Sequence, residues 1–282
     1  MNSFNGYFSI GFRLLVLGLG VTFLGSVGRA ATVELDDNGS VAMVNLDGSV
    51  GANPAGMYEW TVTGLPAGEE NQLNQQWFWY SIDGLAAAPI NTISAATIVS
   101  QTANSVSALY ANSAVSVTIQ YTLSGGGLGQ ADIAEGITLH NASGTNMMFH
   151  FYQYSDFNLL NQAGGDTVSM DNGFVYQNKG DTQIQETIID PSASHFEAGT
   201  NGIPGDTLSK LNGPTRPMLN DNGNAGPADA TWAYEWDFNT LTDQTIQKDK
   251  LLDVTAVPEP SIMGLLSVFG LGIWTWRRRG QA

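Results

Sequence analysis

The dominant feature of this 282-residue chain is a strict alternation of apolar and polar residues along its middle. From Val115 to Leu123 every second side chain is large and apolar, and the residues between are Ser, Thr or Gln. The segment from Trp232 to Phe238 alternates in the same way. Because successive side chains on a strand point to opposite faces, this pattern predicts β-strands. Helical periodicity is almost absent between residues 32 and 257, so we expect an all-β fold.

Two runs, 76–80 and 147–152, carry aromatic or other large apolar side chains on both faces, which predicts central strands covered from both sides. Clusters of Asp, Asn, Ser and Gly separate the runs and predict turns. No repeat of fixed period is present, and the Gly-, Asn- and Pro-rich segment 199–226 is expected to be a long loop. We therefore predict one large, jelly-roll-like β-sandwich over residues 31–257.

Composition excludes several classes of protein. The chain has no Cys, so disulfide frameworks and thiol catalysis are excluded. Its formal net charge of −16 argues against binding to nucleic acid, whose phosphates need basic partners. With 43% hydrophobic and 10% aromatic residues, the chain is not a disordered acidic tail.

The N-terminus has the layout of a secretory signal peptide, which we assign to residues 1–30. A basic-tipped leader precedes an apolar run from Leu14 to Val27, and small residues follow up to Ala30, where we expect cleavage. This apolar run is shorter than the ~20 residues that a spanning helix needs. An uncleaved N-terminal anchor is the alternative.

The C-terminus, residues 258–282, has three parts in a fixed order. The first is an extended tripeptide, Pro258, Glu259 and Pro260. The second is an apolar run over 261–276, which predicts a transmembrane helix. The third is a basic cluster of Arg277, Arg278 and Arg279, which should remain in the cytoplasm and so place the body across the membrane.

These three parts closely resemble the PEP-CTERM sorting signal of Gram-negative bacteria, over Val257 to Arg279. The resemblance implies export through signal peptidase and the secretion machinery, transient anchoring in the inner membrane, and removal of the tail by an exosortase. It implies delivery to the cell surface or the exterior, often in organisms that make exopolysaccharide and biofilm. The segments 76–80, 150–157 and 231–238 more loosely resemble other PEP-CTERM proteins, and carry no activity with them. A permanent C-terminal anchor is the alternative.

Without its two ends the chain keeps 5 basic and 25 acidic residues, a net charge of −20. An anionic, uncharged-polar sandwich suits an exported, non-enzymatic protein of the cell surface or extracellular matrix. It could contact exopolysaccharide through bridging divalent cations. A carbohydrate-binding module of the same fold is the main alternative, because five tryptophans could stack on sugars: Trp60, Trp77, Trp79, Trp232 and Trp236.

Candidate catalytic residues are present without a motif that selects among them. The histidines are His140, His150 and His195, and no metal-binding pair of histidines occurs. Carboxylates that could form a glycosidase pair include Glu69, Glu70, Asp156, Glu186 and Glu235. Sequence spacing does not show which of these meet, so we assign no catalytic, cofactor-binding or metal-binding residue and predict no enzyme. A secreted glycan-active enzyme is the least favoured alternative.

Structural calcium is the one cofactor that the sequence suggests. Calcium prefers carboxylate and carbonyl oxygens, which loops rich in Asp, Asn and Gly supply. The segments 36–39 and 166–171 have this composition, although neither completes an EF-hand. Ordinary turn chemistry explains both segments equally well.

Overall fold

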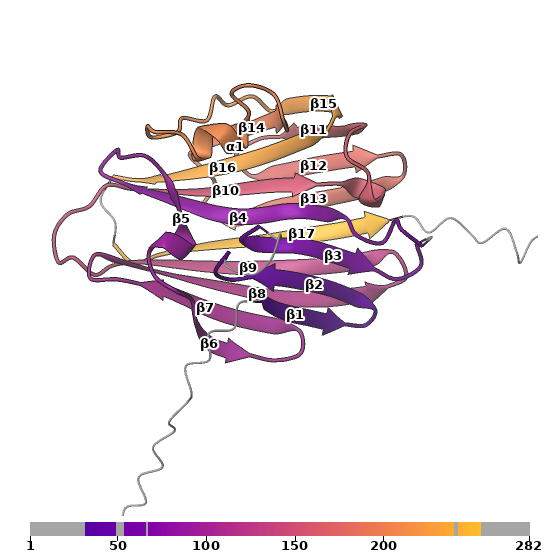
Figure 1. The fold of residues 1–282 in the computed structure, drawn as a ribbon, viewed down its shortest axis with the longest axis horizontal. Coiled ribbons are helices and arrows are strands. Elements are labelled where there is room, and N and C mark those ends of the chain that lie inside the picture. Colours follow the sequence, from indigo (N-terminus) through magenta and orange to yellow (C-terminus); the bar gives the residue numbers. More distant parts are fainter. Residues whose placement is uncertain (1–31, 49–53, 66, 240–241, 255–282) are drawn as a thin grey trace, which may run out of the picture.

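The computed structural model describes residues 32–48, 54–65, 67–239 and 242–254, and these residues form two large sheets that face each other (Figure 1). The predicted all-β fold is confirmed. The first sheet has eight strands in the order β1-β2-β3-β4-β10-β16-β14, with β5 paired to β4. Its strands are β1 (Thr32–Asp37), β2 (Ser40–Asn45), β3 (Gly56–Val62), β4 (Leu73–Ile82), β5 (Ala88–Pro89), β10 (Phe149–Phe157), β14 (His195–Thr200) and β16 (Ala230–Phe238).

The second sheet has nine strands in the order β15-β11-β12-β13-β17-β9-β8-β7-β6. Its strands are β6 (Thr97–Gln101), β7 (Ser105–Ala111), β8 (Val115–Gly127), β9 (Gln130–Asn141), β11 (Asp166–Met170), β12 (Phe174–Lys179), β13 (Thr182–Asp190), β15 (Asn224–Ala228) and β17 (Gln244–Val254). Three short helices complete the described elements: η1 (Ile90–Thr92), η2 (Leu159–Asn161) and α1 (Thr207–Leu211). None of the described helices is long and apolar enough to cross a membrane.

The strand predicted from alternation is β8, which pairs with β9 in a long hairpin. Its apolar residues from Val115 to Leu123 are buried, and the Ser, Thr and Gln residues between them lie on the other face. The glycine-rich segment after β8 forms the turn, where Gly127 and Gly129 adopt φ values of 101° and 75°. Side chains other than glycine rarely adopt such values, which explains the local composition.

The two runs predicted to be central strands are β4 and β10, which lie side by side in the first sheet (Figure 1). All nine residues of β10 are buried. A strand with this pattern needs a cover on each face. The second sheet covers one face, and a later part of the same chain covers the other.

The outer cover is the segment 201–223, which we call the strap. The hydroxyl of Tyr152 on β10 donates a hydrogen bond to the carbonyl oxygen of Pro217 at 3.3 Å. The indole Nε1 of Trp79 on β4 donates to the side-chain oxygen of Asn212 at 3.1 Å. The strap therefore satisfies the polar ends of large side chains whose rings lie against the sheet.

The prediction of one long loop over 199–226 is only partly correct. The segment contains the short helix α1 and reaches into β14 and β15 at its two ends. Asp206 caps α1 by accepting a hydrogen bond from the backbone N–H of Ser209 at 2.7 Å. The capping interaction is local, but such a short helix gives no periodic signal in the sequence.

Two lysines and two glutamates lie between the sheets with fully buried side chains. Lys248 and Lys250 on β17 alternate with outward residues, so both ammonium groups point inward toward Glu135 on β9 and Glu186 on β13. The Nζ atoms of Lys248 and Lys250 lie 3.4 and 3.3 Å from oxygens of Glu186, and both also contact Glu135. We call these four residues the core tetrad.

Gln153 on β10 connects the core tetrad to the first sheet. Its amide Nε2 donates a hydrogen bond to Glu186 at 2.7 Å, and its Oε1 accepts one from Lys248. Burial favours the neutral forms of these groups, but Lys248 and Lys250 still hold the pKa of Glu135 below its ordinary value. All four residues belong to the second sheet, and their charges satisfy one another there.

We predict that Lys250→Met lowers the free energy of unfolding by about 3–5 kcal/mol, because it leaves two buried glutamates with a single lysine between them. Removing charge from both sides, as in Lys250→Met with Glu186→Gln, should cost less than the single change. Urea denaturation measures both variants. Glu34→Gln, at an exposed position of β1, is the control and should change little. A loss below about 1 kcal/mol for Lys250→Met would contradict this account of the core.

Candidate functional site

A cluster of ionisable groups lies on the outer face of the first sheet. His150 is the second residue of β10, and Asp237 is its partner in the adjacent strand β16. Glu235 lies two residues before Asp237, opposite Tyr152. Because alternate residues share a face, all of these side chains point away from Gln153 and the core tetrad.

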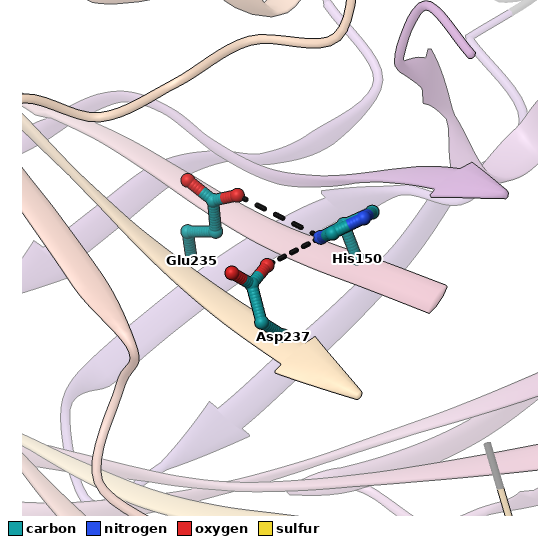
Figure 2. Close-up of side chains that lie close together, drawn as sticks. All are labelled: His150, Glu235 and Asp237. Atoms are coloured by element: carbon teal, nitrogen blue, oxygen red, sulfur yellow. Dashed lines mark hydrogen bonds and ion pairs between the residues drawn. The ribbon is translucent and has the colours of Figure 1, made fainter. Parts of the chain in front are cut away.

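The three groups approach one another closely, as Figure 2 shows. His150 Nδ1 hydrogen-bonds to Asp237 Oδ1 and lies 3.8 Å from Glu235 Oε1. Within the described residues, this is the one set of three His, Cys, Asp or Glu side chains whose ligand atoms all lie within 4.8 Å of one another. The fold thus brings together two residues from β16 and one from β10.

Arg216 of the strap completes the cluster. Its Nη2 donates hydrogen bonds to Glu235 Oε1 at 2.7 Å and to Asp237 Oδ1 at 3.2 Å. The backbone N–H of Leu219 also points to Glu235, at 3.4 Å. The guanidinium supplies the positive charge that a metal ion would otherwise bring, so the arrangement is that of an ion-pair cluster and not of a metal centre.

The two carboxyl groups have opposite proton affinities. Burial raises the pKa of Glu235, and the adjacent Asp237 raises it further. Burial acts in the same sense on Asp237, but the hydrogen bond and charge of His150 hold the pKa of Asp237 below its ordinary value. Paired acids whose pKa values are pushed apart can act as one proton donor and one proton acceptor.

The cluster reaches solvent on one side. Glu235 and His150 are buried, while the side chains of Asp237, Arg216 and His195 are 23%, 27% and 40% exposed. His195 on β14 lies 3.9 Å from Asp237 through its Nε2. A ligand would therefore meet Asp237, Arg216 and His195 first, with Glu235 behind them.

Of the residues singled out in the sequence, His150 and Glu235 meet in this cluster and His195 lies beside it. The third histidine, His140, is on β9 of the second sheet and pairs with Asp243, so no three-histidine site forms. Glu186 belongs to the core tetrad. Asp156 lies at the far end of β10, and Glu69 and Glu70 are partly exposed in a loop.

The cluster also contains residues that sequence reasoning missed. Asp237 could have been found, since it follows Glu235 by two residues on an alternating strand and must share its face. Arg216 gave no signal, because only the folded strap brings it to β16. All five tryptophans considered for sugar stacking are buried, so none is an exposed platform: Trp60, Trp77, Trp79, Trp232 and Trp236.

The segments considered for calcium form turns, at least in part. Asp37 Oδ2 accepts the backbone N–H of Gly125 at 2.8 Å, and Asp171 Oδ1 accepts the backbone N–H of Gly173 at 2.7 Å. Asp166 is buried and faces other carboxylates. The processing residues lie outside the described residues: Ala30, Pro258, Glu259, Pro260, Arg277, Arg278 and Arg279.

No protein-family model and no curated protein matches this chain. Among solved structures, a bacterial glucoamylase complexed with acarbose is similar over 78% of this chain and 32% of its own, with 10% identity and a TM-score of 0.56. This chain thus spans about a third of that glucoamylase. A galactose mutarotase related enzyme from Lactobacillus acidophilus is similar over 79% of this chain and 98% of its own, with 7% identity and a TM-score of 0.49. An aldose epimerase homologue from C. elegans is similar over 79% of this chain and 98% of its own, with 9% identity and a TM-score of 0.45.

At such identity the likeness to the glucoamylase is one of fold, and it corrects two predictions. The protein was expected to be no enzyme and to act as a non-enzymatic surface or matrix protein. Both are contradicted, because its sheets have the arrangement found in a carbohydrate-active enzyme. The error has a physical cause. Sequence spacing hid which carboxylates meet other functional groups: strand pairing brings His150 to Glu235 and Asp237, and the strap brings Arg216 to them.

The histidine at the solvent side of the cluster gives a pH prediction. His195 Nδ1 lies 3.1 Å from both carboxylate oxygens of Asp221, and this hydrogen bond raises the pKa of His195. A raised folded-state pKa stabilises the fold below the ordinary value of about 6.5, and this stability is lost as the pH rises through the folded value. Asp221→Asn should therefore lower the melting temperature at about pH 5 and leave it unchanged above about pH 8.

Asn suits position 221 because it tolerates the positive φ of 57° found there. Melting curves across this pH range provide the measurement. In a His195→Gln background the same substitution should have an effect independent of pH. If Asp221→Asn lowered the melting temperature of the parent protein equally at acidic and alkaline pH, Asp221 would act through something other than His195.

Proposed function

We propose that this protein is a carbohydrate-active enzyme, with His150, Glu235, Asp237 and Arg216 as its acid–base site. The observation that carries the proposal is the pair of adjacent carboxyl groups with opposite pKa shifts, held between an imidazole and a guanidinium. The fold shared with a glucoamylase supports carbohydrate as the substrate class. Sugars offer hydroxyl groups on which such a pair can act.

In this proposal Glu235 is the proton donor and Asp237 the proton acceptor. Burial raises the pKa of Glu235 and so favours its protonated form, while the hydrogen bond with His150 lowers the pKa of Asp237 and fixes its orientation. Arg216 contacts both carboxyl groups and stabilises the negative charge as the proton moves. Asp237 is the part-exposed member, so the sugar hydroxyl would approach from its side.

The spacing favours one kind of proton transfer. Glycosidases place their two carboxyl groups on either side of the scissile bond, at least about 5 Å apart. Here the carboxyl oxygens lie within 4.8 Å on one strand face, next to each other. The pair therefore suits proton transfer at a single oxygen of a sugar, such as an anomeric hydroxyl, and not the flanking of a glycosidic bond.

We predict that Glu235→Gln and Asp237→Asn each lower turnover by about 10²–10⁴-fold, the usual contribution of a positioned acid or base. The substrates to test are free neutral aldoses and neutral oligosaccharides, with anomeric exchange and reducing-end release followed by NMR. Activity should fall on the alkaline side as Glu235 loses its proton, and on the acidic side as Asp237 gains one. Asp237→Asn should remove the acidic limb.

Glu69→Gln is the matched control, since it removes a carboxylate outside the cluster and should retain full activity. Circular dichroism and melting curves establish that each variant is folded. A wild-type protein inert on the whole panel, or a folded Glu235→Gln variant with unchanged turnover, would refute the proposed site.

We further propose that the chain is exported and processed at both ends. The support is the order of parts in the sequence: a leader ending at Ala30, and at the other end the tripeptide 258–260, the apolar run 261–276 and the basic cluster 277–279. In this proposal an exosortase recognises the extended tripeptide and removes the tail. The enzyme would then work at the cell surface or outside the cell.

Replacing Pro258, Glu259 and Pro260 by alanine should leave unprocessed, membrane-bound protein, because the extended recognition segment is lost. Mass spectrometry of the native host's membrane and extracellular fractions gives the measurement. A conservative change in the body, such as Glu69→Gln, should not alter processing. Normal release of the alanine variant, or extracellular protein that still carries the arginines, would contradict the sorting assignment.

A further inference from the structure

A second set of buried polar groups lies at the other end of β10. Asp156 is six residues beyond His150 on the same strand, which places it ~20 Å away on the same face. Among the described residues of this part of the chain, six buried oxygen atoms have no close hydrogen-bond partner, although Asp166 Oδ1 lies 3.5 Å from the ammonium of Lys179. They are Tyr154 Oη, Asp156 Oδ1, Asn158 Oδ1, Asp166 Oδ1, Asp229 Oδ1 and Thr231 Oγ1.

Two of these carboxylates face one another across a single amide. Asn201 Nδ2 lies 3.2 Å from Asp156 Oδ2 and 3.2 Å from Asp229 Oδ2, so each carboxylate uses one oxygen there and leaves the other unpaired. Asn74 donates a further hydrogen bond to Asp156 Oδ2 at 2.9 Å. The second oxygens of Asp156 and Asp229 remain available to a ligand.

Thr231 brings a neutral oxygen to the same place. It is the ladder partner of Asp156, so the two side chains stand next to each other on one face, and it follows Asp229 by two residues. Thr231 is 1% exposed and Asp156 is 2% exposed; Asp156 Oδ1 has no partner, and the Thr231 hydroxyl has only the hydroxyl of Tyr154 beside it. Buried polar atoms in native proteins are nearly always satisfied, which points to a ligand at this position.

The local charge is not balanced by the protein. Asp166 adds a third carboxylate, fully buried, whose charge acts on Asp156. The one nearby cation is Lys179, 3.5 Å from Asp166, and its closest hydrogen bonds go to the carbonyl oxygens of Gln162 and Gly164 at 2.8 and 2.6 Å. Three carboxylates against one ammonium leave two negative charges, which a divalent cation would neutralise.

We propose that Asp156, Asp229 and Thr231 bind a calcium ion at this end of the sandwich. Calcium takes six to eight oxygen ligands and accepts carboxylate, hydroxyl and water together. Water completes the coordination. Asp166 acts from farther away, since the three carboxylates do not gather as closely as the Glu235 cluster does.

The chemistry of the donors selects the kind of metal. The unpaired atoms of the proposed ligands are all oxygens, and no described histidine lies among them. Oxygen-only sites favour hard cations such as calcium over zinc or copper. At the Glu235 cluster the guanidinium of Arg216 fills the cationic role, and at the Asp156 end no arginine does.

A cavity lies on the other side of Gly199 from Thr231. Gly199 on β14 is the ladder partner of Thr231, and a Cβ atom there would lie 3.5 Å from Thr231 Oγ1. Gly199 also lines a cavity of about 270 Å³ between β14 and the strap, together with Asp206 and Thr207. Thr207 Oγ1 would lie 2.6 Å from the same Cβ atom, so the Thr207 side chain packs in the space that the absent side chain leaves.

The test uses the full chain, freed of metal with EDTA and then titrated with calcium chloride. Isothermal titration should show one calcium ion per chain, and saturating calcium should raise the melting temperature by about 5 °C or more. Magnesium should act more weakly, because it demands a smaller and more regular shell. No heat and no shift with calcium would overturn the proposal.

Variants locate the ion. Asp156→Asn and Asp229→Asn should each abolish the calcium-dependent shift while melting no lower than the parent in EDTA, because each removes an unbalanced buried charge. Thr231→Val, which keeps the shape, should weaken calcium binding at least tenfold. Asp36→Asn is the matched control from the other Asp-rich segment and should bind as the parent does.

The outcomes separate this site from the acid–base site. The Glu235→Gln variant should bind calcium normally. The calcium result therefore does not depend on the outcome of the activity assay. Calcium binding that survives both Asp156→Asn and Thr231→Val, or that is lost in Asp36→Asn, would overturn the placement. If Asp156→Asn does not fold, Asp229→Asn and Thr231→Val decide the question by the same criterion.

Discussion

The arrangement of this protein depends on four charges buried between its two sheets. Lys248 and Lys250 reach Glu135 and Glu186, and Gln153 carries that network across to β10. A one-residue slip of β10 would remove Gln153 from the network and turn the opposite set of side chains inward. The charges that fix the register of β10 thus also fix His150 and Asp156 on the outer face.

Positive charge is scarce, and its placement organises the rest of the fold. In the part of the chain that the structure describes, all five lysines and arginines contact carboxylates. Two lie in the core tetrad, Lys210 holds Glu197 beneath the strap, Lys179 lies beside Asp166, and Arg216 joins Glu235 to Asp237. Lys210 and Arg216 thus attach the strap to β14 and β16 by ion pairs, alongside hydrogen bonds such as that from Thr207 to Glu197.

Sequence reasoning predicted the sheets much better than the site. Alternation between Val115 and Leu123 identifies β8 because the signal is local, and the doubly apolar run 147–152 identifies β10 as central for the same reason. The cluster depends on pairing between residues far apart in the chain. His150 and Asp237 are 87 positions apart, and only the ladder between β10 and β16 joins them.

The strap shows the same limit from another side. Its Gly-, Asn- and Pro-rich composition predicts a loop, which is correct for most of its length. The composition does not predict which face of the sheet the loop covers. Its contacts with Tyr152 and Trp79 explain why central strands of this sheet are aromatic on the side away from the core. The same contacts place Arg216, so a residue without any sequence signal becomes part of the candidate site.

Because every described lysine and arginine is engaged with a carboxylate, the described surface presents no spare cation to an approaching polymer. Saccharides bearing uronate, sulfate or phosphate groups would be repelled within the Debye length of about 10 Å at 0.1 M ionic strength. Uncharged and amino sugars meet no such barrier. Discrimination among saccharides would then begin in solution, before any contact with the sheet, and would weaken as the salt concentration rises.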